Sequence, residues 1–157
     1  MNPLVIGVAW WLLKPKKKAS GMGLKARDKI IENIVLDKGY SETLAKLITA
    51  QAKVESGNFT SHLYLTTKNA FGYKCVKNNP LQIGCKVKSP EGDYYASYKS
   101  LNDSVLEILY WLRRREKEGK FIIKDLTDSV SYAKALKKAK FFGGTAEAYS
   151  HLMNQYL

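Results

Sequence analysis

The segment QAKVESGNF, residues 51–59, places a carboxyl group where it could act as an acid. Glu55 follows Gln51 by one helical turn and Ile48 by two, so the three side chains share the apolar face of a predicted helix. Burial disfavours the charged form of a carboxyl group and raises its pKa toward neutrality. Glycosidic cleavage needs such a donor, because the leaving oxygen must be protonated as the bond breaks. Glu55 is therefore a candidate general acid, whereas the alternative for a glutamate near a helix end is simple solvation.

Two linked motifs surround this glutamate. The segment VESGNFTSHLYLTTKNAFGYK, residues 54–74, resembles the glucosaminidase-type peptidoglycan hydrolases, glycoside hydrolase family 73 and the flagellar muramidase group. Those families place a catalytic glutamate in the pattern E-S-G-x-x-x-S at a helix end, and a later segment ends in N-N-L-F-G-I-K. The matching residues are Glu55, Ser56, Gly57 and Ser61 in the first motif and Asn69, Phe71, Gly72 and Lys74 in the second. The resemblance implies a lysozyme-like fold and cleavage of a β-1,4 bond between N-acetylglucosamine and N-acetylmuramic acid.

The resemblance extends more weakly from about residue 25 to the C-terminus. Residues 94–112 are similar to the family's F-R-x-Y-x-S strand end and the helix after it, and residues 135–153 are similar to its terminal Y-A-T-D-P-x-Y-A segment. Phe141 or Phe142 replaces the family's cleft tyrosine, and phenylalanine stacks on a sugar without donating a hydrogen bond.

The family's second carboxylate, usually on the β-hairpin, has no clear counterpart. Glu91 and Asp93 are the nearest candidates for a catalytic role, although E-G-D is also an ordinary polar turn. A retaining enzyme would hold the second carboxyl about 5 Å from Glu55, and an inverting enzyme about 6.5 to 9.5 Å away. Assistance by the sugar's N-acetyl group, or lytic transglycosylation, would need no second carboxylate, and all these mechanisms stay open.

Aromatic side chains are expected to bind the glycan, because flat rings stack on pyranose faces and hydroxyl groups pair with acetamido groups. The predicted substrate-binding residues are Tyr73, Tyr95, Tyr98, Phe142 and Tyr149. The alternative for each of them is an ordinary place in the core.

The elements that would position these groups are mostly helical. Apolar spacing predicts helices over residues 24–37 and from Ser41 to about Gly57. Later helices are predicted from a cap at Ser100 into the polar segment RRREKEGK, residues 113–120, and over about 127–138 and 145–156. Between the second and third of these, residues 81–98 contain two short β-prone runs separated by Pro90, Glu91 and Gly92, which predict one hairpin. The expected fold class is α+β, predominantly helical, with one small β-hairpin, as in lysozyme-like domains.

The first 23 residues differ from the rest. The apolar run LVIGVAWWLL, residues 4–13, precedes the cluster KPKKK, residues 14–18. As a helix, ten residues would span about 15 Å, half of a bilayer's hydrocarbon core, and a signal peptide would carry its lysines before the apolar run. We expect an interfacial anchor and basic linker over residues 1–23 and a glycosidase domain over 24–157. Packing of the apolar run on the domain core or on a partner is the alternative.

Charge and cysteine content limit the remaining choices. The formal net charge of +12 draws the chain toward polyanions or merely keeps it soluble. Cys75 and Cys85 lack the ligand spacing of a zinc site, and neither a metal nor a cofactor is expected. The two cysteines flank a predicted turn and could form a disulfide in an oxidising compartment, but we favour two free, partly buried thiols.

The sequence therefore predicts a peptidoglycan hydrolase of the cell envelope, either a bacterial autolysin or an enzyme of a phage virion. Its expected partners are peptidoglycan glycan strands, with a membrane or virion partner bound through residues 4–18. The alternatives are a lytic transglycosylase, a wall-binding protein without activity, and a basic virion or nucleic-acid-binding structural protein. Specific nucleic-acid binding is not expected, because no standard binding motif is present and the lysines are spread along the chain.

Overall fold

The computed structural model describes residues 21–157, so the proposed anchor over residues 4–18 lies outside the described part of the chain. In chain order the elements are α1 (Gly21–Asp37), α2 (Glu42–Ser56), α3 (His62–Thr67), β1 (Gly84–Lys88), β2 (Tyr94–Ser97), α4 (Leu101–Lys117), the 3-10 turn η2 (Ile123–Asp125), α5 (Ser129–Lys138) and α6 (Ala146–Asn154). Among these helices, none is long and apolar enough to cross a bilayer.

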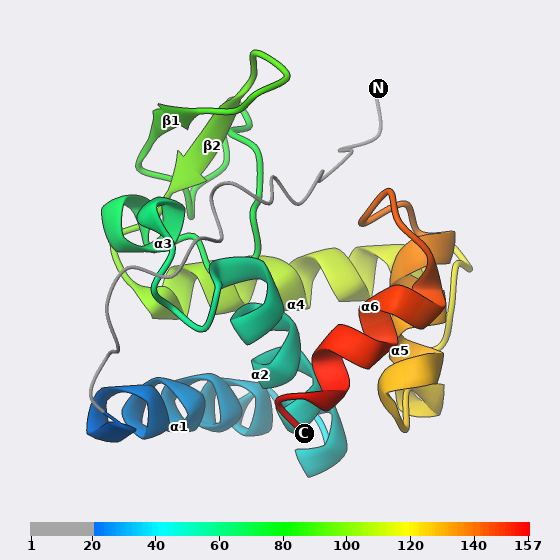
Figure 1. Ribbon diagram of the computed structural model, residues 1–157. Coiled ribbons are helices and arrows are strands. Elements are labelled where there is room, and N and C mark those ends of the chain that lie inside the picture. The colour runs from blue at the N-terminus through cyan, green and yellow to red at the C-terminus, as the bar shows by residue number, and fades with distance from the viewer. Residues whose placement is uncertain (1–20) are drawn as a thin grey trace.

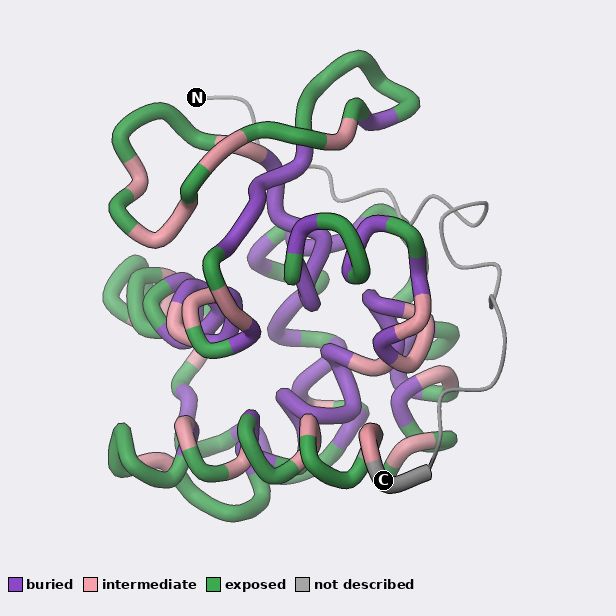
Figure 2. Tube along the Cα trace, turned by 90° about the vertical axis from the view of Figure 1, so that its left-hand side faces the viewer, coloured by how far each residue is buried: buried purple, intermediate pink, exposed green. Residues whose placement is uncertain are grey.

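Helix α2 lies at the centre of the helical part of the molecule. It packs against α1 on one side and α6 on another, while α1 also contacts α4 and α5 packs on α6 (Figure 1). The core contains fully buried side chains from several of these helices, including Ile48, Ile108 and Leu136. Buried positions accordingly follow the inward-facing sides of the helices, whereas the hairpin loops are mostly exposed (Figure 2). The chain therefore places the end of α2 deep in its core.

Local signals at both ends fix the length of α2, as the sequence predicts. The Ser41 hydroxyl accepts a hydrogen bond from the Leu44 N–H at 3.1 Å and caps the first turn. At the other end Gly57 adopts a left-handed backbone with φ of 58°, and its N–H donates to the Lys53 carbonyl. Glycine is the residue that accepts this conformation at least cost. Glu55 consequently lies in the last turn of the helix.

The β-hairpin lies beside α3, and β2 is its buried strand. β1 and β2 are antiparallel, with Gly84 opposite Ser97 and Lys88 opposite Tyr94, and the register shifts between Cys85 and Val87. Three of the four β2 residues are buried, whereas β1 is largely exposed. β2 also pairs with the preceding loop through an isolated bridge between Lys74 and Tyr95. The predominantly helical α+β architecture with one hairpin is thus confirmed.

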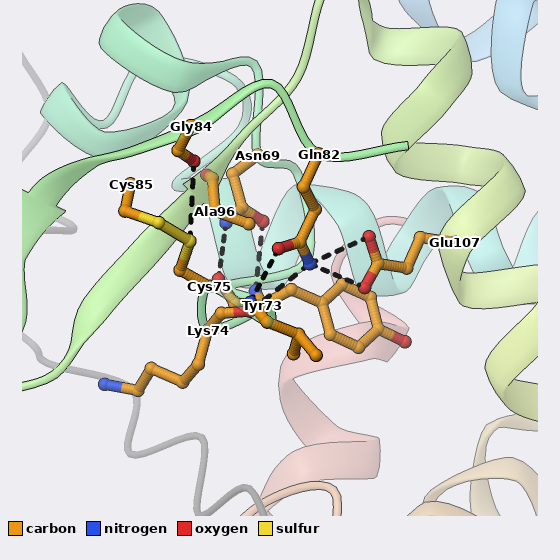
Figure 3. The surroundings of a disulfide bond; sticks show 10 residues. Asn69, Tyr73, Lys74, Cys75, Gln82, Gly84, Cys85, Ala96 and Glu107 are labelled. Carbon is orange, nitrogen blue, oxygen red and sulfur yellow. Dashed lines mark hydrogen bonds between the residues drawn. A yellow bond between two sulfur atoms is a disulfide. The ribbon is translucent and has the colours of Figure 1, made fainter. Parts of the chain in front are cut away.

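Cys75 and Cys85 form a disulfide, so the expectation of two free thiols is wrong. Their segments both pair with β2: the Cys75 N–H donates to the Tyr94 carbonyl at 2.7 Å, and Cys85 lies opposite Ala96. This pairing brings the two Cα atoms to 5.5 Å, a separation that a disulfide spans without backbone movement (Figure 3). The contact depends on strand pairing, which the spacing of the cysteines alone does not specify.

Several elements differ in detail from the expectation. Helix α3 and the turn η2 were not predicted; α3 has six residues and depends on capping by Ser61, whose hydroxyl accepts from the Tyr64 N–H at 3.2 Å. Helix α1 begins at Gly21, three residues early, and α5 begins after an Asp128 cap instead of at Thr127. Ser100 precedes α4 as expected, but its hydroxyl donates to the Asp103 carboxylate and does not cap the backbone.

Candidate active site

Glu55 is a buried carboxyl group at the end of the central helix. Only 6% of its surface is exposed, and its Oε1 accepts a hydrogen bond from the Tyr149 hydroxyl at 2.5 Å. Burial raises the pKa of Glu55 to about 7, and the hydrogen bond from Tyr149 opposes this rise. A carboxyl group with a pKa in this range keeps its proton closer to neutral pH than an ordinary glutamate, which suits a group that must donate it.

Two stacked rings from the C-terminal segment lie next to this carboxyl group. The ring of Tyr149 lies parallel to that of Phe142, with a centroid distance of 4.2 Å and an interplanar angle of 7°. Tyr149 belongs to α6, whose first turn is fixed by Thr145 accepting from the Ala148 N–H at 3.2 Å. Two of the predicted binding residues, Phe142 and Tyr149, are thus brought together with Glu55.

A buried pair that the sequence did not reveal lies one helical turn before Glu55. The Tyr132 hydroxyl donates to Gln51 Oε1 at 2.6 Å, although the two residues are 81 positions apart. Burial, and after it the charge of Glu55, raise the pKa of Tyr132, which places this tyrosine within electrostatic reach of the acid. The Gln51 Nε2 atom is buried and has no hydrogen-bond partner among residues 21–157. Sequence reasoning used Gln51 only to define the helix face and did not identify Tyr132.

The hairpin contributes a tyrosine whose pKa is affected by the charges of two candidate carboxylates, Glu91 and Glu55. Tyr95 is buried in β2, and burial, followed by the charges of Glu91 and Glu55, raises its pKa to about 12. The Lys74 ammonium lies 4.2 Å from the centroid of the Tyr95 ring and 3.2 Å from Glu91 Oε2. Asp93, by contrast, has an exposed side chain, and its carbonyl accepts from the Ser89 N–H across the turn.

Tyr73 and Tyr98 lie in a different part of the core, around Glu107. The Tyr98 hydroxyl donates to Glu107 Oε2 at 2.6 Å, and Gln82 donates to the other carboxylate oxygen at 2.9 Å. Tyr73 packs edge-on against Phe141 at a centroid distance of 5.9 Å. Figure 3 shows Tyr73 together with Gln82 and Glu107 to the right of the disulfide. The structure therefore places these two predicted binding residues around the carboxylate of α4 and not around Glu55.

The chain turns sharply directly after Glu55. Gly57, Asn58 and Phe59 all have φ between 54° and 62°, a run of three left-handed residues. Ser56 supports the turn, because its hydroxyl accepts from the Phe59 N–H at 2.8 Å and donates to the Ala52 carbonyl at 2.6 Å. Left-handed backbone costs a non-glycine residue roughly 1–2 kcal/mol. Such strain at a candidate catalytic position is typical of functional sites, where the surrounding structure fixes the geometry.

Comparisons with known proteins cover almost all of this structure. A family model described as Glucosaminidase, mannosyl-glycoprotein endo-beta-N-acetylglucosaminidase, matches residues 37–157, which include the whole candidate site. A solved structure of a type VI secretion system effector-immunity complex from Pseudomonas protegens is similar with a TM-score of 0.61 and 17% sequence identity, over 85% of this chain and 87% of that chain. No curated protein matches the chain.

Proposed function

The chain belongs to the glucosaminidase family, glycoside hydrolases of lysozyme-like fold that act on peptidoglycan, and from this premise we propose that Glu55 is the general acid that protonates the leaving oxygen of a β-1,4 bond between N-acetylglucosamine and N-acetylmuramic acid. The observation that carries the proposal is the burial of Glu55, which raises its pKa to about 7. A carboxyl group of ordinary pKa would have lost its proton at neutral pH and could not donate it.

Glu91 is the better candidate for the second carboxylate. Its pKa is lowered by hydrogen bonds from its own backbone and then from the Lys74 ammonium, so it is charged under conditions in which Glu55 is protonated. Two carboxyl groups whose environments separate their pKa values in this way are suited to the roles of acid and base. Asp93 offers no comparable contact to the site. We assign Glu91 as the group that activates water or stabilises the developing positive charge on the sugar.

Aromatic side chains from two parts of the chain support the proposal of glycan binding. The stacked rings of Phe142 and Tyr149 come from the C-terminal segment, and Tyr95 comes from the hairpin. Sugars bind through stacking on such rings and through hydrogen bonds to a small number of fixed polar groups. Phe142, Tyr149 and Tyr95 are buried, so we propose that they form the floor of the glycan site. Tyr73 and Tyr98 would act from a greater distance by supporting the loop around Glu107.

Peptidoglycan as the substrate places the action of the enzyme at the cell envelope. The net charge of +12 suits an anionic wall surface. An anchor over residues 4–18, and a role in a phage particle or as an autolysin, extend this proposal. A lytic transglycosylase is the alternative activity, because it would use the same acid and form an anhydro-sugar end without a second carboxylate.

The test compares the wild-type protein with Glu55→Gln on purified peptidoglycan, with mass spectrometry of the released muropeptides. Loss of general acid catalysis typically costs about 10² to 10⁴ in rate, and we expect a loss of that size with an unchanged circular dichroism spectrum. Glu32→Gln, on the partly exposed side of α1, is the matched control and should remain fully active. Equal release by wild type and Glu55→Gln would refute the assignment.

The new chain ends identify the bond. Reducing N-acetylglucosamine ends would indicate a glucosaminidase, reducing N-acetylmuramic acid ends a muramidase, and anhydro ends a transglycosylase. The glucosaminidase end is the expected product, and either other end would correct the bond or the reaction while leaving Glu55 as the acid.

A further inference from the structure

Lys74 is a buried lysine whose backbone is held from several directions. It forms the bridge to Tyr95, its carbonyl accepts from Gln82 Nε2 at 3.3 Å, and the next residue, Cys75, is joined to Cys85. Gln82 in turn donates to the Glu107 carboxylate on α4. The position from which the Lys74 side chain starts is therefore tied to the hairpin, the disulfide loop and the helical core.

The ammonium group of Lys74 is equally constrained. It lies over the face of the Tyr95 ring, at 4.2 Å from the centroid, and forms an ion pair with Glu91 at 3.2 Å. A lysine is rarely buried unless it is paired, because removal of a charge from water is costly. The ring face attracts the cation and the carboxylate neutralises it, so both contacts favour the same placement of Nζ.

Glu91, by contrast, lies outside the core, and its hydrogen bonds other than that from Lys74 come from its own turn. It lies in the exposed turn between β1 and β2, and about half of its side chain is accessible. Ordering a glutamate side chain costs rotamer entropy, so a turn carboxylate without a partner in the core would sample many directions. The ion pair with the buried Lys74 ammonium restricts the directions that the Glu91 side chain can take.

We propose that Lys74 is a positioning residue that holds the Glu91 carboxylate beside the Tyr95 ring. This inference rests on the proposed role of Glu91 in the reaction. The ammonium touches neither sugar nor the reacting atoms; it acts through the carboxylate. Lys86 and Lys88 on β1 are exposed and do not provide this contact, so Lys74 is the lysine of this region suited to the task.

The experiment measures kcat and KM on soluble, peptide-free glycan strands for Lys74→Met, Lys74→Arg, Glu91→Gln and the double variant Lys74→Met/Glu91→Gln. Lys88→Met, on the exposed outer strand, is the control and should match wild type. Misplacement of a catalytic group by about 1 Å costs roughly 10²-fold, so Lys74→Met should lose about 10- to 100-fold in kcat with little change in KM. Lys74→Arg keeps the charge and should recover most of the rate.

The double variant separates positioning from general support of the fold. If Lys74 acts through Glu91, the double variant is no slower than Glu91→Gln alone. An additional loss equal to that of Lys74→Met would overturn the inference, because it would show that Lys74 acts independently of Glu91. A Lys74→Met variant as fast as wild type, in an enzyme that Glu91→Gln inactivates, would also overturn it while leaving the proposed function intact.

Failure of the proposed function gives a different pattern. Full activity of Glu91→Gln, with Glu55→Gln inactive, would remove Glu91 from the reaction and with it the positioning role of Lys74. Thermal unfolding of each variant establishes that the compared proteins are folded at the assay temperature.

Discussion

Replacement of Glu55 by glutamine should stabilise the protein increasingly as the pH rises. Burial raises the pKa of Glu55 from 4.5 to about 7. Between these values the folded protein holds a proton that the unfolded chain has released, so wild-type stability falls with increasing pH and the loss is complete above the folded pKa. One pKa unit corresponds to about 1.4 kcal/mol, which gives a total of about 3 kcal/mol. Glutamine does not titrate, and its Oε1 can still accept from Tyr149.

Urea unfolding followed by far-UV circular dichroism between pH 4 and pH 8.5 measures this effect. The free energy of unfolding of Glu55→Gln relative to wild type should be constant below about pH 4.5, rise through pH 5 to 7 and reach a plateau about 3 kcal/mol higher. Glu32→Gln should show no such rise. A difference between Glu55→Gln and wild type that stays constant across the whole range would refute the reasoning, because it would mean that folding does not perturb the Glu55 carboxyl group.

Two further changes test the surroundings of the acid. Tyr149→Phe removes the hydrogen bond that lowers the pKa of Glu55, so the pKa of Glu55 should rise further. The basic limb of the pH profile of kcat/KM should then move up by about one pH unit. A basic limb that does not move would contradict this expectation. Gly57→Ala places a side chain at φ of 58° and should reduce the free energy of unfolding, measured with urea, by about 1–2 kcal/mol. Gly143→Ala is the control and should have little effect, because the space around its Cβ is open. Equal effects of the two substitutions would argue against backbone strain at Gly57.

Much of the fold could be predicted because it is encoded locally. Ser41 and Gly57 delimit α2 through capping contacts between residues that are three or four positions apart, and the turn around Gly92 sets the hairpin. The burial of Glu55 follows from the same kind of information, since a residue one turn after Gln51 on an apolar helix face must point inward. The sequence therefore predicts the burial of Glu55 without knowledge of its neighbours.

The neighbours themselves could not be derived in this way. Tyr73, Tyr98 and Tyr149 are chemically identical candidates, yet Tyr149 contacts Glu55 and Tyr98 contacts Glu107. Which tyrosine meets which carboxylate depends on how α6 and the hairpin pack on the central helices, and no local pattern specifies that packing. The bond between Tyr132 and Gln51 and the disulfide of Cys75 depend on tertiary structure in the same manner.

The arrangement of charges around the two carboxyl groups explains how one chain keeps them in opposite states. Despite a net charge of +12, the causes that shift the pKa of Glu55 are burial and a tyrosine hydroxyl, with no lysine or arginine of the described residues among them. A nearby ammonium would favour the carboxylate and remove the proton that the proposed general acid must donate. Lys74, the buried cation on the hairpin side, is instead occupied by Glu91 and the Tyr95 ring. Hydrogen bonds from its own backbone and then from Lys74 therefore lower the pKa of Glu91, whereas burial without a neighbouring cation among the described residues raises the pKa of Glu55.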